Sequence, residues 1–147
     1  MIEEIKLVRN EWNKPVSEAQ NKMDCHAPVE MNDTPKVIHR DLGMLYFHML
    51  NEELREYREA VQDEDLTQEE KLIQIADALI DIQYVLNGAI AAHGLTDKAE
   101  ALFKEVHRSN LTKIKDGNVV LNEDGKVMKR KDDYEAPFLS KILFEGK

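Results

Sequence analysis

Hydrophobic residues recur every three or four positions over most of the chain, and this spacing predicts helices. The first long helix is expected over residues 36–62. A second begins at Thr67, where Glu70 three positions later completes a capping-box pair. It is expected to end near residue 93, because the glycine that follows suits the left-handed position after a helix. A further helix is predicted from residue 96 to about residue 115.

The two ends of the chain have a more interrupted pattern. Residues 2–14 are predicted to form a short amphipathic helix that Pro15 stops, and residues 15–35 a polar connection. After residue 115, two Asp-Gly pairs flank short β-prone runs, which is typical of a small hairpin. The prediction is a single all-α domain over residues 1–147. It is an antiparallel helical bundle of four to five helices, with its core over about residues 36–115 and a hairpin-like tail over residues 116–147.

Five carboxylates stand where the apolar stripes of the two long helices should continue. Glu52, Glu53 and Glu56 follow the stripe of the first helix, and Asp77 and Asp81 lie one turn apart on the second. Two carboxylates about 4 Å apart repel by roughly 4 kcal/mol at an effective dielectric near 20. Convergence of all five would therefore require a cation. Oxygen ligands favour a hard ion, Mg²⁺ or Mn²⁺ before Zn²⁺.

These carboxylates allow two other interpretations. Glutamates on helices usually face water, so the cluster could be a solvated face. Asp77 and Asp81 argue against this, because apolar residues surround them and Asp is a poor residue inside a helix. A ferritin-like di-iron site is excluded, because none of the five histidines has a glutamate three positions before it.

Composition narrows the compartment and the partners. The net charge of −9 argues against binding to a nucleic-acid polymer, but it allows a small phosphorylated ligand whose charge metal ions balance. The single cysteine, Cys25, excludes an intrachain disulfide. No stretch approaches the ~20 apolar residues that span a bilayer, and no signal-peptide run is present. A cytoplasmic protein without a membrane partner is expected.

The second long helix has another apolar side, apart from its carboxylates. A helix that must bury two sides favours a homodimer or homotetramer, although a well-covered monomer stays open. The residues on this side are Leu72, Ile75, Leu79, Ile82, Leu86 and Ile90.

Three motifs then stand out in order and spacing. They are Glu52-Glu53-Leu-Arg-Glu56, then Asp77-Ala-Leu-Ile-Asp81-Ile-Gln-Tyr84-Val, and Glu105-Val-His-Arg108-Ser-Asn110-Leu-Thr-Lys113. Together they resemble the all-α nucleoside triphosphate pyrophosphohydrolases, which include MazG, dimeric dUTPases and phosphoribosyl-ATP pyrophosphohydrolase. The resemblance covers about residues 45–137, with the small single-domain MazG-like branch as the best fit. One position departs: the second motif is commonly Glu-x-x-Asp, but Ala78 stands three before Asp81.

The resemblance implies an enzyme that cleaves a nucleoside or deoxynucleoside triphosphate to the monophosphate and pyrophosphate. The implied cofactor is Mg²⁺, for which Mn²⁺ substitutes. The metal ligands would be Glu53, Glu56, Asp77 and Asp81, with Asp81 firmer than Asp77. Glu52 or Glu53 would orient the attacking water. Substrate contacts would come from Tyr84, Asn87, Arg108, Asn110, Lys113, Lys129 and Tyr134.

The substrate contacts have simpler explanations on residue type alone. Arg108 and Lys113 could complement a helix dipole, Tyr84 could pack in the core, and the basic tail could be solvated. For the whole protein, the alternative is a non-catalytic helical oligomerisation or binding protein with a structural cation. Phosphoribosyl-ATP as substrate is disfavoured, because nothing in the sequence recognises its second phosphoribosyl arm.

Overall fold

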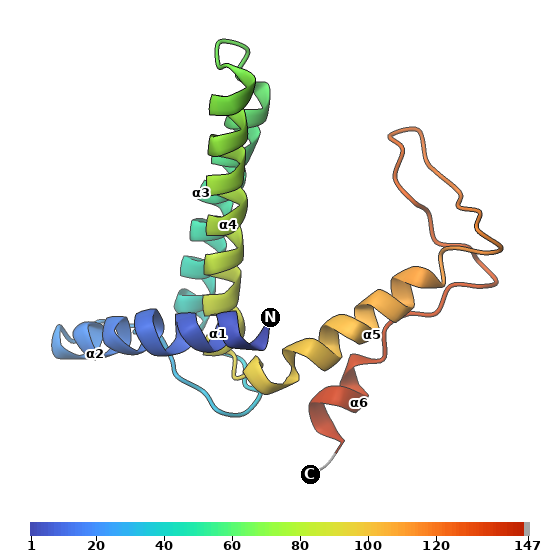
Figure 1. Ribbon diagram of the computed structural model, residues 1–147. Coiled ribbons are helices and arrows are strands. Elements are labelled where there is room, and N and C mark those ends of the chain that lie inside the picture. The colour runs from blue at the N-terminus through green and yellow to red at the C-terminus, as the bar shows by residue number, and fades with distance from the viewer. Residues whose placement is uncertain (146–147) are drawn as a thin grey trace. The chain divides into compact units, whose positions relative to one another are not determined.

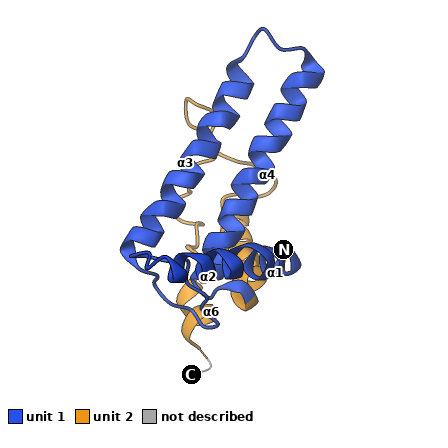
Figure 2. Ribbon diagram, turned by 90° about the vertical axis from the view of Figure 1, so that its left-hand side faces the viewer, with its two compact units in different colours: residues 1–96 blue, residues 97–147 orange. Residues whose placement is uncertain are grey.

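The computed structural model describes residues 1–145, and every regular element within them is a helix (Figure 1). The all-α prediction is therefore confirmed. The chain divides into two compact units, residues 1–96 and residues 97–147 (Figure 2). That the chain is a single domain stays a prediction. The helices of the first unit are α1 (Ile2–Val8), α2 (Lys14–Lys22), α3 (Arg40–Gln62) and α4 (Gln68–Ala92).

The N-terminal helix does not stop at Pro15, so the prediction of an end there is wrong. A π-helical segment, η1 (Arg9–Asn13), joins α1 to α2, and helical structure continues to Lys22. The amide of Lys14 donates to the carbonyl of Arg9, five residues earlier. Pro15 has no amide hydrogen to donate, and the wider turn just before it lets the chain continue as a helix.

Helix α3 begins four residues later than predicted, because His39 caps it. The His39 Nδ1 atom accepts a hydrogen bond from the Asp41 amide at 3.2 Å. The preceding residues have no regular secondary structure and are held to the end of α4. Lys36 N donates to His93 O at 2.9 Å, and Asn32 Nδ2 donates to Ala92 O at 2.7 Å.

The turn between α3 and α4 and the end of α4 are as the sequence predicted. The Thr67 side chain and the Glu70 side chain form a reciprocal capping box. At the other end of α4, Gly94 has a φ of +68°. A Cβ atom added there would lie 2.0 Å from the Thr34 carbonyl oxygen, so this position requires glycine.

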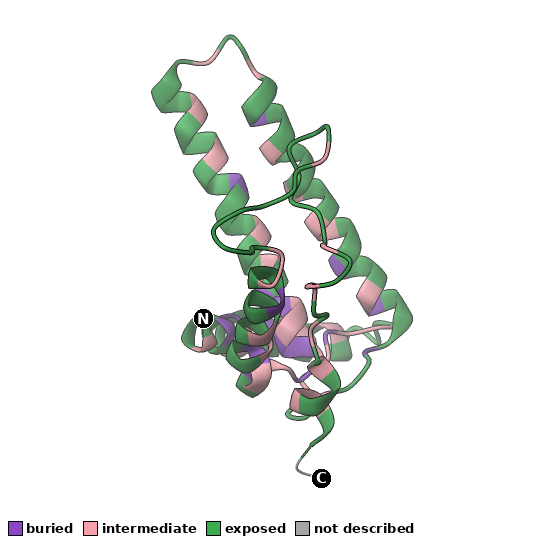
Figure 3. Ribbon diagram, turned by 90° about the vertical axis from the view of Figure 1, so that its right-hand side faces the viewer, coloured by how far each residue is buried: buried purple, intermediate pink, exposed green. Residues whose placement is uncertain are grey.

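Buried residues of the first unit gather where α1 and η1 meet one end of the α3–α4 hairpin (Figure 3). Ile5, Leu42 and Asn13 are the largest fully buried side chains. Further along the hairpin, large apolar side chains are exposed, including Leu72 at 67% and Ile80 at 60%. The isolated chain therefore leaves much of the hairpin's apolar surface uncovered.

Helix α4 is also more apolar than the sequence analysis allowed. It has 25 residues, and its most apolar stretch reaches a mean hydropathy of 1.3 with only 28% of that stretch buried. By length and composition it could cross a membrane, so the expectation that no segment has this character is wrong. However, Asp77 and Asp81 lie within the helix, and a charge at the centre of a spanning helix costs about 2.5–3.5 kcal/mol.

The second unit contains α5 (Ala99–Leu111), preceded by the short 3₁₀ turn η2 (Thr96–Lys98), and α6 (Leu139–Phe144). Helix α5 ends four residues before the predicted position, where the Thr112 hydroxyl donates to the Ser109 carbonyl at 2.7 Å. The tail contains isolated bridges rather than strands within the described residues, at Lys115–Asn118 and Leu121–Val127. The predicted hairpin is thus reduced to two bridges, and α6 was not predicted.

Candidate functional site

The antiparallel pairing of α3 and α4 brings the five predicted carboxylates into one electrostatic environment. Glu53 is partly buried, and this burial is the main reason that its pKa is raised. The negative charges of Glu56, Asp81, Glu52 and Asp77 raise it further, in that order. A carboxylate is affected in this way only when the others lie near it. The acidic faces of the two helices therefore converge.

This acidic cluster, Glu52, Glu53, Glu56, Asp77 and Asp81, lacks a balancing charge. None of the five forms a salt bridge with any residue among those described, 1–145. Among residues 1–145, no three members of this cluster each place an oxygen within 4.8 Å of the others. Ligand atoms come that close in another group, which is described below. Carboxylate oxygens with uncompensated charge suit a hard divalent cation, which would draw them together.

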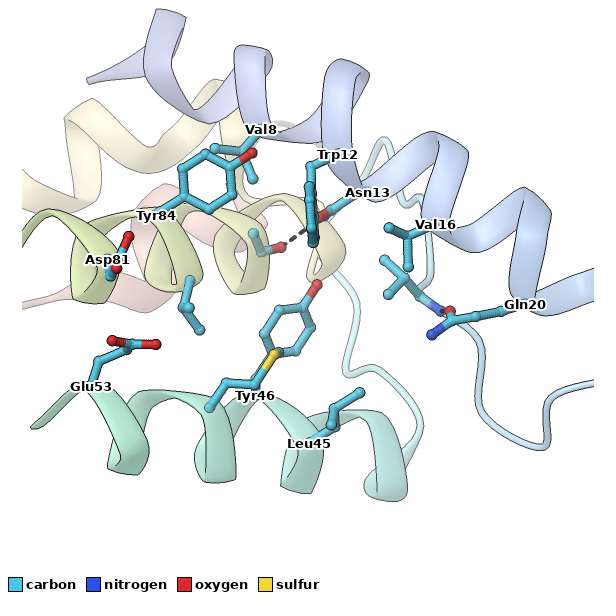
Figure 4. Close-up of a pocket in the computed structure, with 14 residues that line it drawn as sticks. Val8, Trp12, Asn13, Val16, Gln20, Leu45, Tyr46, Glu53, Asp81 and Tyr84 are labelled. Carbon is cyan, nitrogen blue, oxygen red and sulfur yellow. Dashed lines mark hydrogen bonds between the residues drawn. The ribbon is translucent and has the colours of Figure 1, made fainter. Parts of the chain in front are cut away.

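A cavity of about 460 Å³ adjoins the acidic cluster and is formed within the first unit by the N-terminal helices, α3 and α4. Glu53 and Asp81 lie at one end of it and Gln20 at the other (Figure 4). The walls between them are mostly aliphatic and aromatic. The volume is within the range of small-molecule sites, and a few polar groups among apolar walls are typical of such sites.

Aromatic side chains form the middle of the cavity. Trp12 and Tyr84 make an edge-to-face pair with ring centroids 6.0 Å apart. Tyr46 is buried beside them, and its hydroxyl has no hydrogen-bond partner of acceptable geometry among the described residues. Burial raises the pKa of the Tyr46 phenol to about 12, and the nearby Asn13 side chain offsets only part of that shift. Tyr46 therefore stays protonated at neutral pH.

Gly88 lets the N-terminal helix approach α4 at this cavity. The Asn13 side chain donates from Nδ2 to the Gly88 carbonyl oxygen at 3.0 Å. A Cβ atom added at Gly88 would lie 3.3 Å from Asn13 Oδ1 and 3.4 Å from the Tyr46 ring. Of the predicted substrate contacts on α4, Tyr84 lines the cavity. Asn87 is buried but does not line it.

Sequence reasoning missed the contribution of the N-terminal helix to this site. Trp12 stood on the apolar side of residues 2–14 and was the only tryptophan, which is a weak signal of a site. Asn13 and Gln20 gave no signal, because a helix that stopped at Pro15 would not present them together. Tyr46 did not belong to the apolar stripe of its helix.

The predicted substrate contacts of the second unit form a group of their own. Lys129 Nζ lies 4.7 Å from the centre of the Tyr134 ring, and Lys113 Nζ lies 6.0 Å from it. Lys113 also donates to Asn110 Oδ1 at 2.7 Å. The nearby Ser109 side chain is the main cause that lowers the pKa of Tyr134, and the two lysine charges lower it further.

Arg108 is engaged differently. Its guanidinium donates two hydrogen bonds to Glu105, both of 2.9 Å, and one to Glu135 at 2.7 Å. The two hydrogen bonds from Arg108, together with one from the Phe138 amide, hold the pKa of the Glu105 carboxyl at about 2. To bind a phosphate, Arg108 would have to break its hydrogen bonds to one of these two carboxylates and donate them to the phosphate instead.

A second group of metal-type ligands lies at the start of α3, and the sequence analysis assigned it no role. Ligating atoms of His26, His39 and Asp41 lie within 4.8 Å of one another, and all three residues are exposed. His26 Nε2 lies 3.1 Å from Asp41 Oδ2, and His39 is the helix cap. The contact between His26 and Asp41 and the helix cap account for this arrangement, and imidazoles suit softer metals than Mg²⁺.

The helical fold and the convergence of the predicted carboxylates agree with the resemblance to the MazG-like, all-α pyrophosphohydrolases. A family model described as phosphoribosyl-ATP pyrophosphohydrolase matches residues 26–110, more than half of the chain. The chain belongs to this family, and it is a hydrolase that acts on phosphoric anhydrides. The family generally depends on divalent cations. No curated protein matches the chain.

Proposed function

We propose that the protein is a Mg²⁺-dependent nucleoside triphosphate pyrophosphohydrolase, which cleaves a nucleoside or deoxynucleoside triphosphate to the monophosphate and pyrophosphate. The observation that carries this proposal is the position of Glu53 and Asp81. Both belong to the acidic cluster, and both line one end of an apolar, aromatic cavity. A triphosphate bound at the carboxylates through metal ions would leave its nucleoside facing the cavity.

Glu53, Glu56 and Asp81 would hold the metal, with Asp77 as a further ligand. Bound Mg²⁺, or Mn²⁺ in its place, supplies positive charge for the phosphates and lowers the pKa of a coordinated water. Glu52, or Glu53 in its place, would accept a hydrogen bond from the attacking water and so orient it toward the phosphorus.

The second unit would supply contacts to the substrate. Lys113, Lys129 and Tyr134 gather with Asn110 and offer cations and hydrogen-bond donors to a phosphate or a sugar. We propose that Arg108 also contacts the substrate, once it has exchanged a hydrogen bond to a carboxylate for one to a phosphate.

The family name raises phosphoribosyl-ATP as a second candidate substrate. Its additional phosphoribosyl arm carries a phosphate that needs a cation or several donors. Among the described residues 1–145, the charged ones that line the cavity are Glu53 and Asp81, and both are acidic. An ordinary nucleoside triphosphate fits this cavity better, because its apolar walls suit a base and its negative end suits metal-bound phosphates.

We also propose that the protein is a homodimer or homotetramer of the cytoplasm, where nucleotides are available. The large exposed apolar side chains on α3 and α4, such as Phe47 at 56% and Leu72 at 67%, support a second copy packed on the hairpin. Two such hairpins would form a four-helix bundle.

The test is pyrophosphate release from a panel of all ribo- and deoxynucleoside triphosphates and phosphoribosyl-ATP, with Mg²⁺, Mn²⁺ or EDTA. We expect metal-dependent release with at least one nucleoside triphosphate. Asp81→Asn should lower kcat/KM at least ~100-fold, the upper end of what loss of an outer-shell partner costs a metal site. Glu69→Gln, in the exposed first turn of the same helix, is the matched control. The proposal is wrong if no nucleoside triphosphate yields pyrophosphate with either metal.

A further inference from the structure

The N-terminal helix forms one wall of the cavity, and it lies outside the residues that match the family. Trp12, Asn13 and Gln20 line the cavity, whereas the family match begins at residue 26. Membership in the family therefore says nothing about what this wall recognises. The opposite wall comes from α3 and α4 and carries Tyr46 and Tyr84.

Two polar groups that line the cavity away from the carboxylates have atoms without a hydrogen-bond partner among the described residues. The Tyr46 hydroxyl is buried and lacks a partner within residues 1–145. Such a group costs about 1–3 kcal/mol unless something satisfies it. Gln20 accepts a hydrogen bond from the Val29 amide through Oε1 at 2.7 Å. This contact fixes the orientation of the amide and leaves its NH₂ group as the donor.

We propose that this cavity is a nucleobase site, in which the Tyr46 hydroxyl and the Gln20 amide read the polar edge of the base and Trp12 covers its face. This inference rests on the proposed function, because it assigns the part of the substrate that the carboxylates do not hold. The order of groups agrees with the order of a nucleotide. The acidic residues lie at one end of the cavity, the aromatic residues in the middle and Gln20 at the far end (Figure 4).

The chemistry of the two groups selects a class of base. The Gln20 NH₂ group requires an acceptor on the base, and the Tyr46 hydroxyl donates or accepts. A base with a carbonyl oxygen at this position (O4 of uracil or thymine, O6 of guanine) satisfies Gln20 directly. Adenine and cytosine have an amino group at the corresponding position, which would leave the NH₂ group opposed by a donor. A site built to make such a hydrogen bond discriminates strongly against a base that lacks it.

Tyr46→Phe is the informative variant, because the hydroxyl that it removes has no partner in the protein. We expect the ligand-free variant to have a Tm equal to or above that of the wild type, because it loses a buried hydroxyl that has no partner, while kcat/KM for the preferred base falls about tenfold. For the disfavoured bases kcat/KM should hardly change, so the ratio of kcat/KM between preferred and disfavoured bases should fall. Tyr57→Phe on the same helix, outside the cavity, is the matched control and should alter neither quantity.

Trp12 provides a readout that does not depend on turnover, because it is the only tryptophan and lines the cavity. Nucleoside monophosphates with a carbonyl-bearing base should change its fluorescence, and tripolyphosphate should not. If tripolyphosphate causes the same change, or if Tyr46→Phe leaves the base preference of an active enzyme intact, the base lies elsewhere and this inference is overturned. If no triphosphate is hydrolysed but the monophosphates still change the fluorescence, the proposed function fails and the base site stands.

Discussion

The Asn13 side chain and the Gly88 carbonyl oxygen, 75 positions apart in the chain, are joined by a buried hydrogen bond of 3.0 Å. This contact ties the N-terminal helix to α4 next to the cavity. It depends on the absence of a side chain at Gly88, which lets the two helices come close. One wall of the cavity is therefore positioned by a single close approach of two helices.

Gly88→Ala should weaken this approach, and Gly43→Ala provides a matched comparison. Both glycines lie inside helices, where alanine is favoured by about 1 kcal/mol. At Gly43 no atom lies within 4 Å of an added Cβ, so Gly43→Ala should stabilise the protein by about that amount. At Gly88 the Cβ would meet Asn13 Oδ1 at 3.3 Å, and the hydrogen bond to Gly88 holds that atom in place. Overpacking costs about 1–3 kcal/mol, so the net effect is destabilising.

Chemical denaturation of the two variants measures the difference directly. The expected pattern is a higher midpoint for Gly43→Ala and a lower one for Gly88→Ala, at unchanged slopes. If both variants gained the same free energy of unfolding, the close approach of the two helices would not matter for stability.

Glu53→Gln should stabilise the metal-free protein. The pKa of Glu53 is raised, first by burial and then by four carboxylates, so its ionised form is disfavoured in the folded state. The contribution of Glu53 to the free energy of unfolding therefore increases as pH falls through the raised pKa. At neutral pH the ionised side chain destabilises the folded protein. Removing the charge should raise the free energy of unfolding by ~0.5–1 kcal/mol, the scale of interactions between partly exposed charges.

The same substitution should remove the response to metal. Wild-type protein is expected to gain thermal stability from Mg²⁺ or Mn²⁺, because an ion that binds only the folded state stabilises it. Glu53→Gln should start from a higher Tm in EDTA and gain little when metal is added. A variant less stable than wild type in EDTA would contradict the idea of a strained, uncompensated acidic cluster.

The two long helices and the acidic cluster could be predicted from the sequence, because they depend on local periodicity. A stripe that continues as Glu52, Glu53 and Glu56 identifies the helix face and its chemistry at once. The capping box at Thr67 and the glycine at 94 are equally local, since each acts within one turn of its helix.

The cavity could not be predicted in the same way. Its N-terminal wall requires the chain to continue as a helix past Pro15 through a π-helical turn, and no pattern of residue types identified that turn. The hydrogen bond between Asn13 and Gly88 links positions with no regular spacing between them. The unpartnered hydroxyl of Tyr46 is likewise visible only after the helices are packed.

Acid should loosen the tail of the second unit from α5. Glu105 accepts two hydrogen bonds from Arg108 and one from the Phe138 amide at 2.8 Å. These contacts lower the pKa of Glu105 to about 2, with the Arg108 hydrogen bonds as the largest cause. Because the pKa of Glu105 in the folded protein lies below its ordinary value of 4.5, the contribution of Glu105 to stability is fully present above pH 4.5 and is lost as pH falls toward 2. The Phe138 amide resonance in ¹⁵N–¹H spectra should report this titration. Glu105→Gln should abolish the shift, and a midpoint near 4.5 in the wild type would contradict the assignment.

Leu72→Glu should separate the copies of the proposed homo-oligomer. Leu72 is 67% exposed in the isolated chain and belongs to the apolar side of α4 that carries no carboxylates of the acidic cluster. A partner packed on this side would have to bury the new carboxylate without a counter-charge, which is far more costly than burying leucine.

Gln74→Glu, two positions away and also exposed, adds the same charge as a control. Light scattering after size exclusion should give a multiple of 17.0 kDa for the wild type and for Gln74→Glu. Leu72→Glu should shift the mass to that of one chain. A wild type that already elutes at 17.0 kDa would refute the oligomer, and the exposed apolar side of α4 would then need another partner.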